Sequence, residues 1–234
     1  MTRNTVIILL IGLLIAGGGA YVALSGDSSE ATGTTPVVET GTKADWPAKR
    51  AEPVPASHDN GIAVLGFADA PVTVIEYASM TCGHCAHFHT DSLPGIKEKY
   101  VDTGLVKFEF RPFPLDIWAA RASMIASCGG DKYFAFADLL FRRQAQWISN
   151  DEQKIRSELE SIAAIGGMGK DAVDQCLTDE ALFQRIVEIR QEGEKTHKVN
   201  STPTLIIDGK NYTGVMSVKE FSDAVDPLLK DALN

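Results

Sequence analysis

The sequence predicts an α/β fold in which a central mixed sheet is flanked by helices and interrupted by an inserted all-helical domain, with an N-terminal hydrophobic segment before it. Two observations predict it. Apolar runs of strand length occur in two separate regions, 62–115 and 198–234. Between them, residues 116–197 carry apolar side chains at the spacing of amphipathic helices and no strand pattern.

The N-terminal region has a different composition from the rest. Residues 6–24 contain no charged side chain and follow Arg3, a pattern typical of an export signal or a membrane anchor. The run approaches the length of about 20 residues that spans a bilayer, and it lacks a clear small-residue cleavage site. We therefore interpret residues 1–24 as a signal peptide or membrane anchor, and favour an uncleaved anchor. Residues 25–61 are polar and rich in Gly, Ser, Thr and Pro, which predicts a flexible linker.

The first part of the sheet domain, residues 62–115, is expected to contain strands and one long helix. The helix should run from about Cys82 to Tyr100, with a kink at Pro94 because proline lacks an N–H group. Strands are predicted where apolar residues alternate or run together, at 62–65, 72–78 and 106–110.

The helical block and the end of the chain follow the same periodicities. Strands are expected at 204–207 and 211–213, and a closing helix at 217–229, where Ser217 and Glu220 have the spacing of a capping box. The apolar stripes that predict helices in the block are Trp118, Ala122 and Ile125; Ile155, Leu159 and Ile162; and Leu182, Ile186 and Ile189.

Composition argues against a nucleic-acid partner. The chain has 22 basic and 31 acidic side chains, for a formal net charge of −9 at pH 7. An acidic surface repels phosphate groups, and no run of lysine or arginine occurs.

The motif Cys82-Gly83-His84-Cys85 is the main chemical signal. At the start of a helix, free N–H groups and the helix dipole favour a thiolate at the first cysteine, and Ser79 or Thr81 could cap that helix. His84 adds a donor beside the sulfur. We therefore expect the pKa of Cys82 to lie well below that of free cysteine, and the pair to be oxidising, at roughly −180 to −120 mV.

Other roles for these cysteines compete with redox chemistry. Cys82 and Cys85 could form a plain structural disulfide, although so tight a loop is unusual for one. A haem attachment is disfavoured because Ala86, not histidine, follows the motif. We expect His87 and His89 to be surface or rim residues and predict no metal or other cofactor. The residues that a metal site could use are Cys82, His84, Cys85, His87 and His89.

The remaining cysteines, Cys128 and Cys176, lie on the apolar sides of predicted helices. Both should point into the helical block, and an exported protein favours pairing them. We predict a structural disulfide between them, with two inert buried thiols as the alternative.

Three segments together resemble the DsbA-like branch of the thioredoxin superfamily, a group of thiol–disulfide oxidoreductases. They are residues 70–77 (APVTVIEY), the CGHC motif, and residues 202–209 (TPTLIIDG). The resemblance implies that Pro203 is cis and faces the dithiol, and that Thr202 offers its backbone to an extended client segment. It also implies that Glu76 is buried and relays a proton to or from Cys85.

The function that this resemblance implies is the introduction of disulfide bonds into exported proteins. The expected location is the periplasm or cell envelope, with anchoring in the inner membrane through the N-terminal segment. The expected partners are client proteins with free cysteines and a membrane protein of the DsbB type that reoxidises the dithiol. A disulfide isomerase or reductase of the same fold remains an alternative, as do a metal-handling thiol protein and a chaperone-like binding protein.

Overall fold

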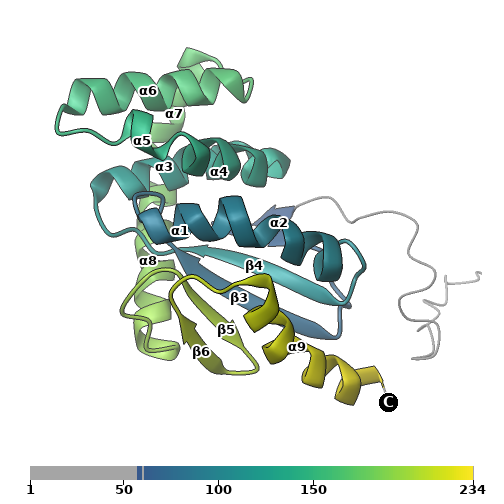
Figure 1. The fold of residues 1–234 in the computed structure, drawn as a ribbon. Coiled ribbons are helices and arrows are strands. Elements are labelled where there is room, and N and C mark those ends of the chain that lie inside the picture. The colour runs from purple at the N-terminus through teal and green to yellow at the C-terminus, as the bar shows by residue number, and fades with distance from the viewer. Residues whose placement is uncertain (1–56, 60, 234) are drawn as a thin grey trace, which may run out of the picture. The chain divides into compact units, whose positions relative to one another are not determined.

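The computed structural model describes residues 57–59 and 61–233, which belong to one of the two units into which the chain divides, Gly41–Asn234. Their strands form one six-stranded sheet in the order β1-β2-β4-β3-β5-β6 (Figure 1). Only β3 and β4 run parallel; the other neighbours are antiparallel, so the sheet is mixed. The strands are β1 (Ser57–Asp59), β2 (Ile62–Leu65), β3 (Val72–Ala78), β4 (Val106–Pro112), β5 (Thr204–Ile207) and β6 (Lys210–Thr213).

Strand β1 corrects one prediction, because it lies inside the segment 25–61 that we expected to be a flexible linker. It pairs antiparallel with β2, with Ser57 opposite Val64. A short edge strand of polar residues is held by backbone hydrogen bonds, which leave no apolar pattern in the sequence. The other predictions for residues 1–56 lie outside the described residues. Across 57–59 and 61–233, no helix has both the length and the apolar character needed to cross a membrane.

The helix that begins at the CGHC motif is continuous but not uniform. Segments α1 (Gly83–His87) and α2 (Leu93–Ile96) alternate with the π-helical turns η2 (Phe88–Ser92) and η3 (Lys97–Val101). Pro94 lies in the first turn of α2, which follows η2. The irregularity at the predicted kink is therefore the wider π-helical turn η2 that precedes this proline. One side of this helix is buried; it carries Cys85, Phe88, Ile96 and Tyr100.

The inserted helices lie between β4 and β5 in the sequence, and the described structure has no strand among them. All the residues of the three predicted stripes are buried except Trp118 and Leu182, which are partly exposed. The helices are α3 (Ile117–Cys128), the 3₁₀ turn η4 (Gly130–Lys132), α4 (Tyr133–Arg142), α5 (Gln144–Trp147), α6 (Glu152–Ile165), α7 (Lys170–Leu177) and α8 (Glu180–Thr196).

Helices cover both faces of the sheet (Figure 1). On one face, the helix from α1 to η3 and the closing helix α9 (Val218–Leu233) pack on Val74 and Phe108 through side chains such as Phe88 and Phe221. On the other face, α8 packs on Tyr77 through Ile189. The predicted capping box of α9 is present, because the backbone N–H of Ser217 donates to Glu220 Oε2 at 2.8 Å.

A third cluster joins the sheet to the inserted helices. Met80 and Cys85 pack with Phe136 of α4 and Ile155 of α6 in one buried group. The redox motif therefore lies at the boundary between the two parts of the molecule. This architecture confirms the predicted thioredoxin-like fold with a helical insertion.

Candidate active site

Cys82 is the N-cap residue of α1, just after the end of β3, and it is half-buried while Cys85 is fully buried. No side chain caps this helix, so the expectation that Ser79 or Thr81 does so is wrong. The Thr81 hydroxyl instead donates to Asp116 Oδ2 at 2.6 Å, and Ser79 Oγ accepts from the backbone N–H of Leu115 at 3.3 Å. Both side chains tie the loop before Cys82 to the segment that starts α3.

The surroundings of Cys82 stabilise its thiolate. A hydrogen bond from the Cys85 thiol, together with donors from Thr202 and from the backbone N–H groups of Cys85 and His84, lowers the pKa of Cys82 to about 5 against the opposing effect of burial. The predicted lowering is therefore present, and the backbone N–H groups at the helix start contribute to it as expected, although the largest cause is the Cys85 thiol. His84 contributes its backbone N–H, and its imidazole is exposed.

The second cysteine has the opposite tendency. Burial, then the hydrogen bond to Cys82, then the charge of Glu76 raise the pKa of the Cys85 thiol far above its ordinary value. Cys85 therefore holds its proton at neutral pH, whereas Cys82 releases one. Two thiols one helical turn apart thus differ in the property that decides which sulfur leaves most easily as an anion.

The segment that faces Cys82 comes from the other end of the chain. The Thr202–Pro203 peptide bond is cis, and the Cys82 thiol donates to the Thr202 carbonyl oxygen at 3.3 Å. The Thr202 hydroxyl oxygen is buried and has no hydrogen-bond partner when Cys82 is a thiol. Once Cys82 is ionised, this hydroxyl is available to it as a donor.

Glu76 lies on β3 and is fully buried, with His89 as its partner. His89 Nε2 is 3.1 Å from Oε1 and 2.9 Å from Oε2 of the carboxylate. The expectation that His89 is a surface or rim residue is therefore wrong, since it is only 6% exposed. His89 is four residues after Cys85 and so shares its helix face, a signal that the sequence offered. His87 is exposed and pairs with Asp91 at 2.9 Å.

A further residue at the site carried no signal in the sequence. Gln144 of α5 donates through its side-chain nitrogen to the carbonyl oxygens of Met80 and Cys82, at 2.9 and 3.0 Å. The inserted helices therefore hold the backbone of the CGHC motif directly. A glutamine in a helix has many possible roles, so only the tertiary structure identifies this one.

The second pair of cysteines forms a disulfide. The Cys128–Cys176 bond has an S–S distance of 2.08 Å and joins the end of α3 to α7. Cys176 is buried, as expected, but Cys128 is exposed. Cys128 is the last residue of α3, where the helix ends at Gly129, so it is exposed even though its sulfur is bonded to the buried Cys176 of α7.

The five candidate metal ligands do not gather around one point. His89 binds Glu76, His87 pairs with Asp91, and His84 is exposed. In the part of the chain that the structure describes, no group of three or more His, Cys, Asp or Glu residues is arranged to hold a metal ion.

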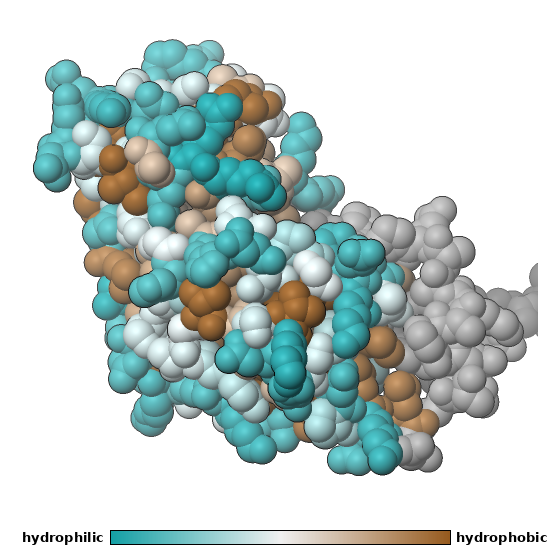
Figure 2. Space-filling model, viewed as in Figure 1, coloured by the Kyte–Doolittle hydropathy of each residue, from teal (hydrophilic) through white to brown (hydrophobic). Residues whose placement is uncertain are grey.

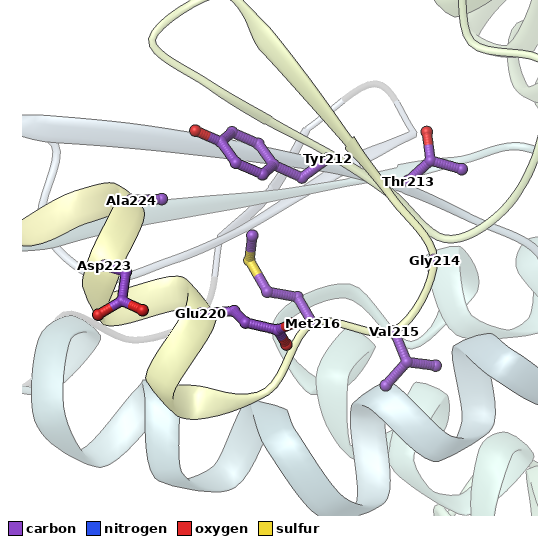
Figure 3. A pocket seen from close by; sticks show the side chains of 8 residues that line it. All are labelled: Tyr212, Thr213, Gly214, Val215, Met216, Glu220, Asp223 and Ala224. Atoms are coloured by element: carbon purple, nitrogen blue, oxygen red, sulfur yellow. The ribbon is translucent and has the colours of Figure 1, made fainter.

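The pockets and the visible surface add little to the site. A pocket of about 410 Å³ lies between β6 and α9 (Figure 3), but its carboxylates are engaged within α9: Glu220 in the capping box and Asp223 with Lys219. On the face shown in Figure 2, hydrophobic residues form small separate groups among hydrophilic ones. Two exposed apolar side chains, Leu115 and Ile117, flank the Asp116 that binds Thr81.

A pair of thiols with opposite proton affinities, held at the start of a helix beside a cis proline, has the properties that thiol–disulfide exchange requires. Comparison with known proteins agrees with this class. The family model described as Thioredoxin matches residues 58–227. The chain therefore belongs to the thioredoxin family.

Individual relatives give the extent of the similarity. A Rickettsia bellii protein named as a protein-disulfide oxidoreductase is 31% identical over 182 residues, which cover 75% of this chain and 68% of that protein. Matches to four further Rickettsia relatives cover 62–66% of those proteins. The crystal structure of alpha-DsbA1 from Wolbachia pipientis is 33% identical, with a TM-score of 0.68, and the match covers 73% of this chain and 92% of that one. The chain is therefore a protein-disulfide oxidoreductase of the DsbA type.

A more distant relative is disulfide bond formation protein D of Bacillus subtilis. It is 26% identical over 175 residues, which cover 73% of this chain and 78% of that protein. The structure of BdbD from the same species superimposes with a TM-score of 0.65 at 23% identity, over 76% of this chain and 99% of that one, and it supports the fold.

Proposed function

We propose that this protein introduces disulfide bonds into exported proteins, using Cys82 and Cys85 as the redox-active pair. The observation that carries the proposal is the low pKa of Cys82, about 5, beside a second thiol that keeps its proton. A stabilised thiolate favours the reduced form of the enzyme and therefore makes its disulfide an oxidant.

The reaction begins with the pair oxidised. A client thiolate attacks Cys82 Sγ, the Cys82–Cys85 bond breaks, and Cys85 leaves and takes up a proton because it is buried. A second client thiolate then attacks the client sulfur of the mixed disulfide, and Cys82 leaves as a thiolate without needing a proton. The client ends with a disulfide and the enzyme with two thiols.

The neighbouring residues have roles in this scheme. Thr202, beside cis Pro203, offers its backbone to an extended client segment and its hydroxyl to the Cys82 thiolate. His84 supplies a backbone N–H to the same sulfur. Glu76 exchanges a proton with Cys85. In support, the charge of this carboxylate raises the pKa of the Cys85 thiol, as the third cause after burial and the hydrogen bond to Cys82. The exposed side chains of Leu115 and Ile117 suit apolar segments of an unfolded client.

The reduced enzyme needs an oxidising partner, for which we propose a membrane protein of the DsbB type. We place the protein in the periplasm or cell envelope, with residues 1–24 as signal or anchor and 25–56 as linker. The uncharged run 6–24 after Arg3 supports this, as does the Cys128–Cys176 disulfide, because disulfides persist in oxidising compartments.

An isomerase is the second candidate, and one similarity favours it. A crystal structure of a protein-disulfide isomerase from Novosphingobium aromaticivorans is 26% identical, with a TM-score of 0.63 over 74% of this chain and 98% of that one. The two functions differ in the redox state that the pair holds in the cell: an oxidase is kept oxidised, and an isomerase reduced.

Equilibration with glutathione tests the oxidase proposal. We expect a reduction potential of roughly −180 to −120 mV for the Cys82–Cys85 pair, the range of oxidising members of this class. The fraction reduced is measured by alkylation and mass spectrometry, with the Cys128–Cys176 disulfide as an internal control that stays oxidised. A potential below about −250 mV is that of a reductant and contradicts the proposal. If alkylation in intact cells finds Cys82 and Cys85 mainly as free thiols, the isomerase function is favoured.

A further inference from the structure

A buried group of ionisable side chains lies behind Cys85, where β3, the helix of the CGHC motif and the inserted helices meet. Glu76 from β3 is fully buried, as is Tyr133 at the start of α4. The side chain of His89, from the π-helical turn η2, is 4% exposed. Ionisable groups are seldom buried this completely without a partner, so their contacts decide what they can do.

The closest contact in this group is between His89 and Glu76. The Nε2 atom of His89 lies 2.9 and 3.1 Å from the two carboxylate oxygens, so one donor serves both. The imidazole is enclosed by aromatic rings, with centroid distances of 4.3 Å to Phe141 and 5.5 Å to Phe110. In such apolar surroundings a carboxylate keeps its charge only if a donor or a cation replaces the lost water.

Other ionisable groups respond to this carboxylate. After burial and the hydrogen bond to Cys82, the charge of Glu76 is the next cause that raises the pKa of the Cys85 thiol. Burial and then the same charge raise the pKa of Tyr133 well above its usual value. Cys85 from α1 and Tyr133 from α4 are thus the ionisable groups whose titration is linked to the pair, and both keep their protons at neutral pH. Besides the Cys82 sulfur, to which the Cys85 thiol donates, the Glu76 carboxylate is therefore the buried group to which the proton of Cys85 is electrostatically linked.

We propose that Glu76 and His89 act as one proton-exchanging pair for Cys85, in which His89 is a positioning residue that keeps the carboxylate ionised and ready to accept a proton. The proposal rests on the thiol–disulfide exchange assigned above to Cys82 and Cys85. It adds a role for His89, a residue that does not contact the reacting sulfurs.

The step in question starts from a mixed disulfide on Cys82. Cys85 Sγ attacks Cys82 Sγ and forms the Cys82–Cys85 bond, while the bond from Cys82 to the client sulfur breaks. The client leaves as a thiolate with the electron pair of that bond. The Cys85 proton passes to the Glu76 carboxylate, whose hydrogen bond from His89 is retained. In the opposite direction, when a client thiolate opens the disulfide, the same proton returns to Cys85.

Removing the imidazole should change the pH at which this step works. Without a donor, the buried carboxylate favours its neutral, protonated form, which cannot accept a second proton. In His89→Leu, whose side chain has no hydrogen-bond donor, attack by Cys85 should therefore be slow at pH 7 and should recover only at higher pH. Attack by Cys82 should change little, because its thiolate is stabilised by Cys85, Thr202 and backbone N–H groups.

Stopped-flow reaction of the reduced protein with excess Ellman's reagent separates the two sulfurs. The first release of thionitrobenzoate depends on reagent concentration and reports Cys82. The second does not, and it reports Cys85 attack on the mixed disulfide. We expect His89→Leu to slow the second phase at pH 7 by about 10-fold or more and to shift its pH midpoint upwards, with the first phase within about twofold of the unmodified protein.

Two controls make the result specific. His87→Leu removes a histidine from the exposed side of the same helix and should leave both phases unchanged. The double variant Glu76→Gln/His89→Leu should be no slower than Glu76→Gln alone, because the pair acts as a unit. An unchanged first phase shows that the variant is folded at the site; if His89→Leu loses it, His89→Met takes its place.

The outcomes separate this proposal from the function on which it rests. A second phase in His89→Leu that is as fast as or faster than that of the unmodified protein, with the same pH midpoint, overturns the role of His89 while leaving thiol–disulfide exchange intact. If the unmodified protein itself shows no fast first phase or no second release, the proposed function fails instead.

Discussion

Cys82 and Cys85 differ in proton affinity because of where the chain places each sulfur. Cys82, at the helix N-cap, receives hydrogen bonds from Cys85, from Thr202 and from backbone N–H groups, which together outweigh the effect of its partial burial. Cys85, one turn further on, is surrounded by protein and lies near the Glu76 carboxylate. This asymmetry gives exchange a direction, because the lower-pKa sulfur is the better leaving group.

The order of those causes can be tested on the reduced protein. The rate of alkylation by iodoacetamide as a function of pH should give a midpoint near pH 5 for Cys82. Cys85→Ala removes the largest contribution and should raise this midpoint the most, while Thr202→Val removes a smaller one and should raise it less. Equal midpoints in the three proteins would show that the helix N-terminus alone stabilises the thiolate.

Sequence reasoning at the residue scale succeeded where the cause was local. The position of Cys82 at a helix start follows from the motif and from the strand before it. The role expected of the His84 imidazole and the surface position expected of His89 both failed. The contact between Cys82 and Thr202 joins residues 120 apart in the chain, and the contact between His89 and Glu76 requires the helix to pack on β3. Local patterns do not contain such pairings.

The same distinction holds for whole elements. Strands β2, β3 and β5 begin and end where the sequence predicts, because each has a continuous or alternating apolar pattern that matches its burial. Strand β1 was missed because it consists of three polar residues at the edge of the sheet. The π-helical turn η2 was missed because its sequence is compatible with an ordinary helix.

The packing of α8 on the sheet provides a prediction about stability. A Cβ atom added at Gly193 would lie 2.5 Å from Cε1 and 2.9 Å from Cδ1 of Tyr77, whose ring is fully buried. Because α8 cannot approach the sheet so closely with a larger residue, Gly193→Ala should lower the free energy of unfolding by on the order of 1–3 kcal/mol. Urea denaturation measures the change.

Gly169→Ala is the matched control for this substitution. A Cβ atom there meets nothing within 4 Å, and the backbone φ of −72° suits alanine. It should cost less than about 1 kcal/mol, the scale of a change at a helix N-cap. If the two variants unfold at the same urea concentration, the contact between α8 and Tyr77 does not limit the packing of the helix.

On the scale of the whole molecule, the redox pair is part of a core that the sheet shares with the inserted helices. Cys85 belongs to the same buried cluster as Phe136 and Ile155, and Gln144 holds the backbone at Met80 and Cys82. A change in the charge of Cys82 is therefore linked to the stability of the folded chain. The thermodynamic cycle that joins folding and reduction makes this link quantitative.

The reduced protein should gain stability over the oxidised protein as pH rises from about 5 to 9. The folded pKa of Cys82 is about 5, below the ordinary value of 9.0, so between these values the unfolded state binds more protons. The contribution of the thiolate is complete above the unfolded value and is lost as pH falls through about 5. Cys85 adds little slope below about pH 8, because its thiol is neutral in both states there; closer to the ordinary value of 9.0 it ionises only in the unfolded state and opposes the gain.

Melting temperatures at several pH values test this linkage. Glutathione is the appropriate reductant, because it reduces an oxidising pair and leaves a stable structural disulfide such as Cys128–Cys176 intact. The difference in Tm between the reduced and oxidised proteins should widen from pH 5 to pH 8. Cys82→Ser has no thiolate at this position, so its Tm should change with pH as that of the oxidised protein does. A difference that is constant over this range would mean that the folded state does not favour the Cys82 thiolate, and the oxidising character inferred from it would have no physical basis.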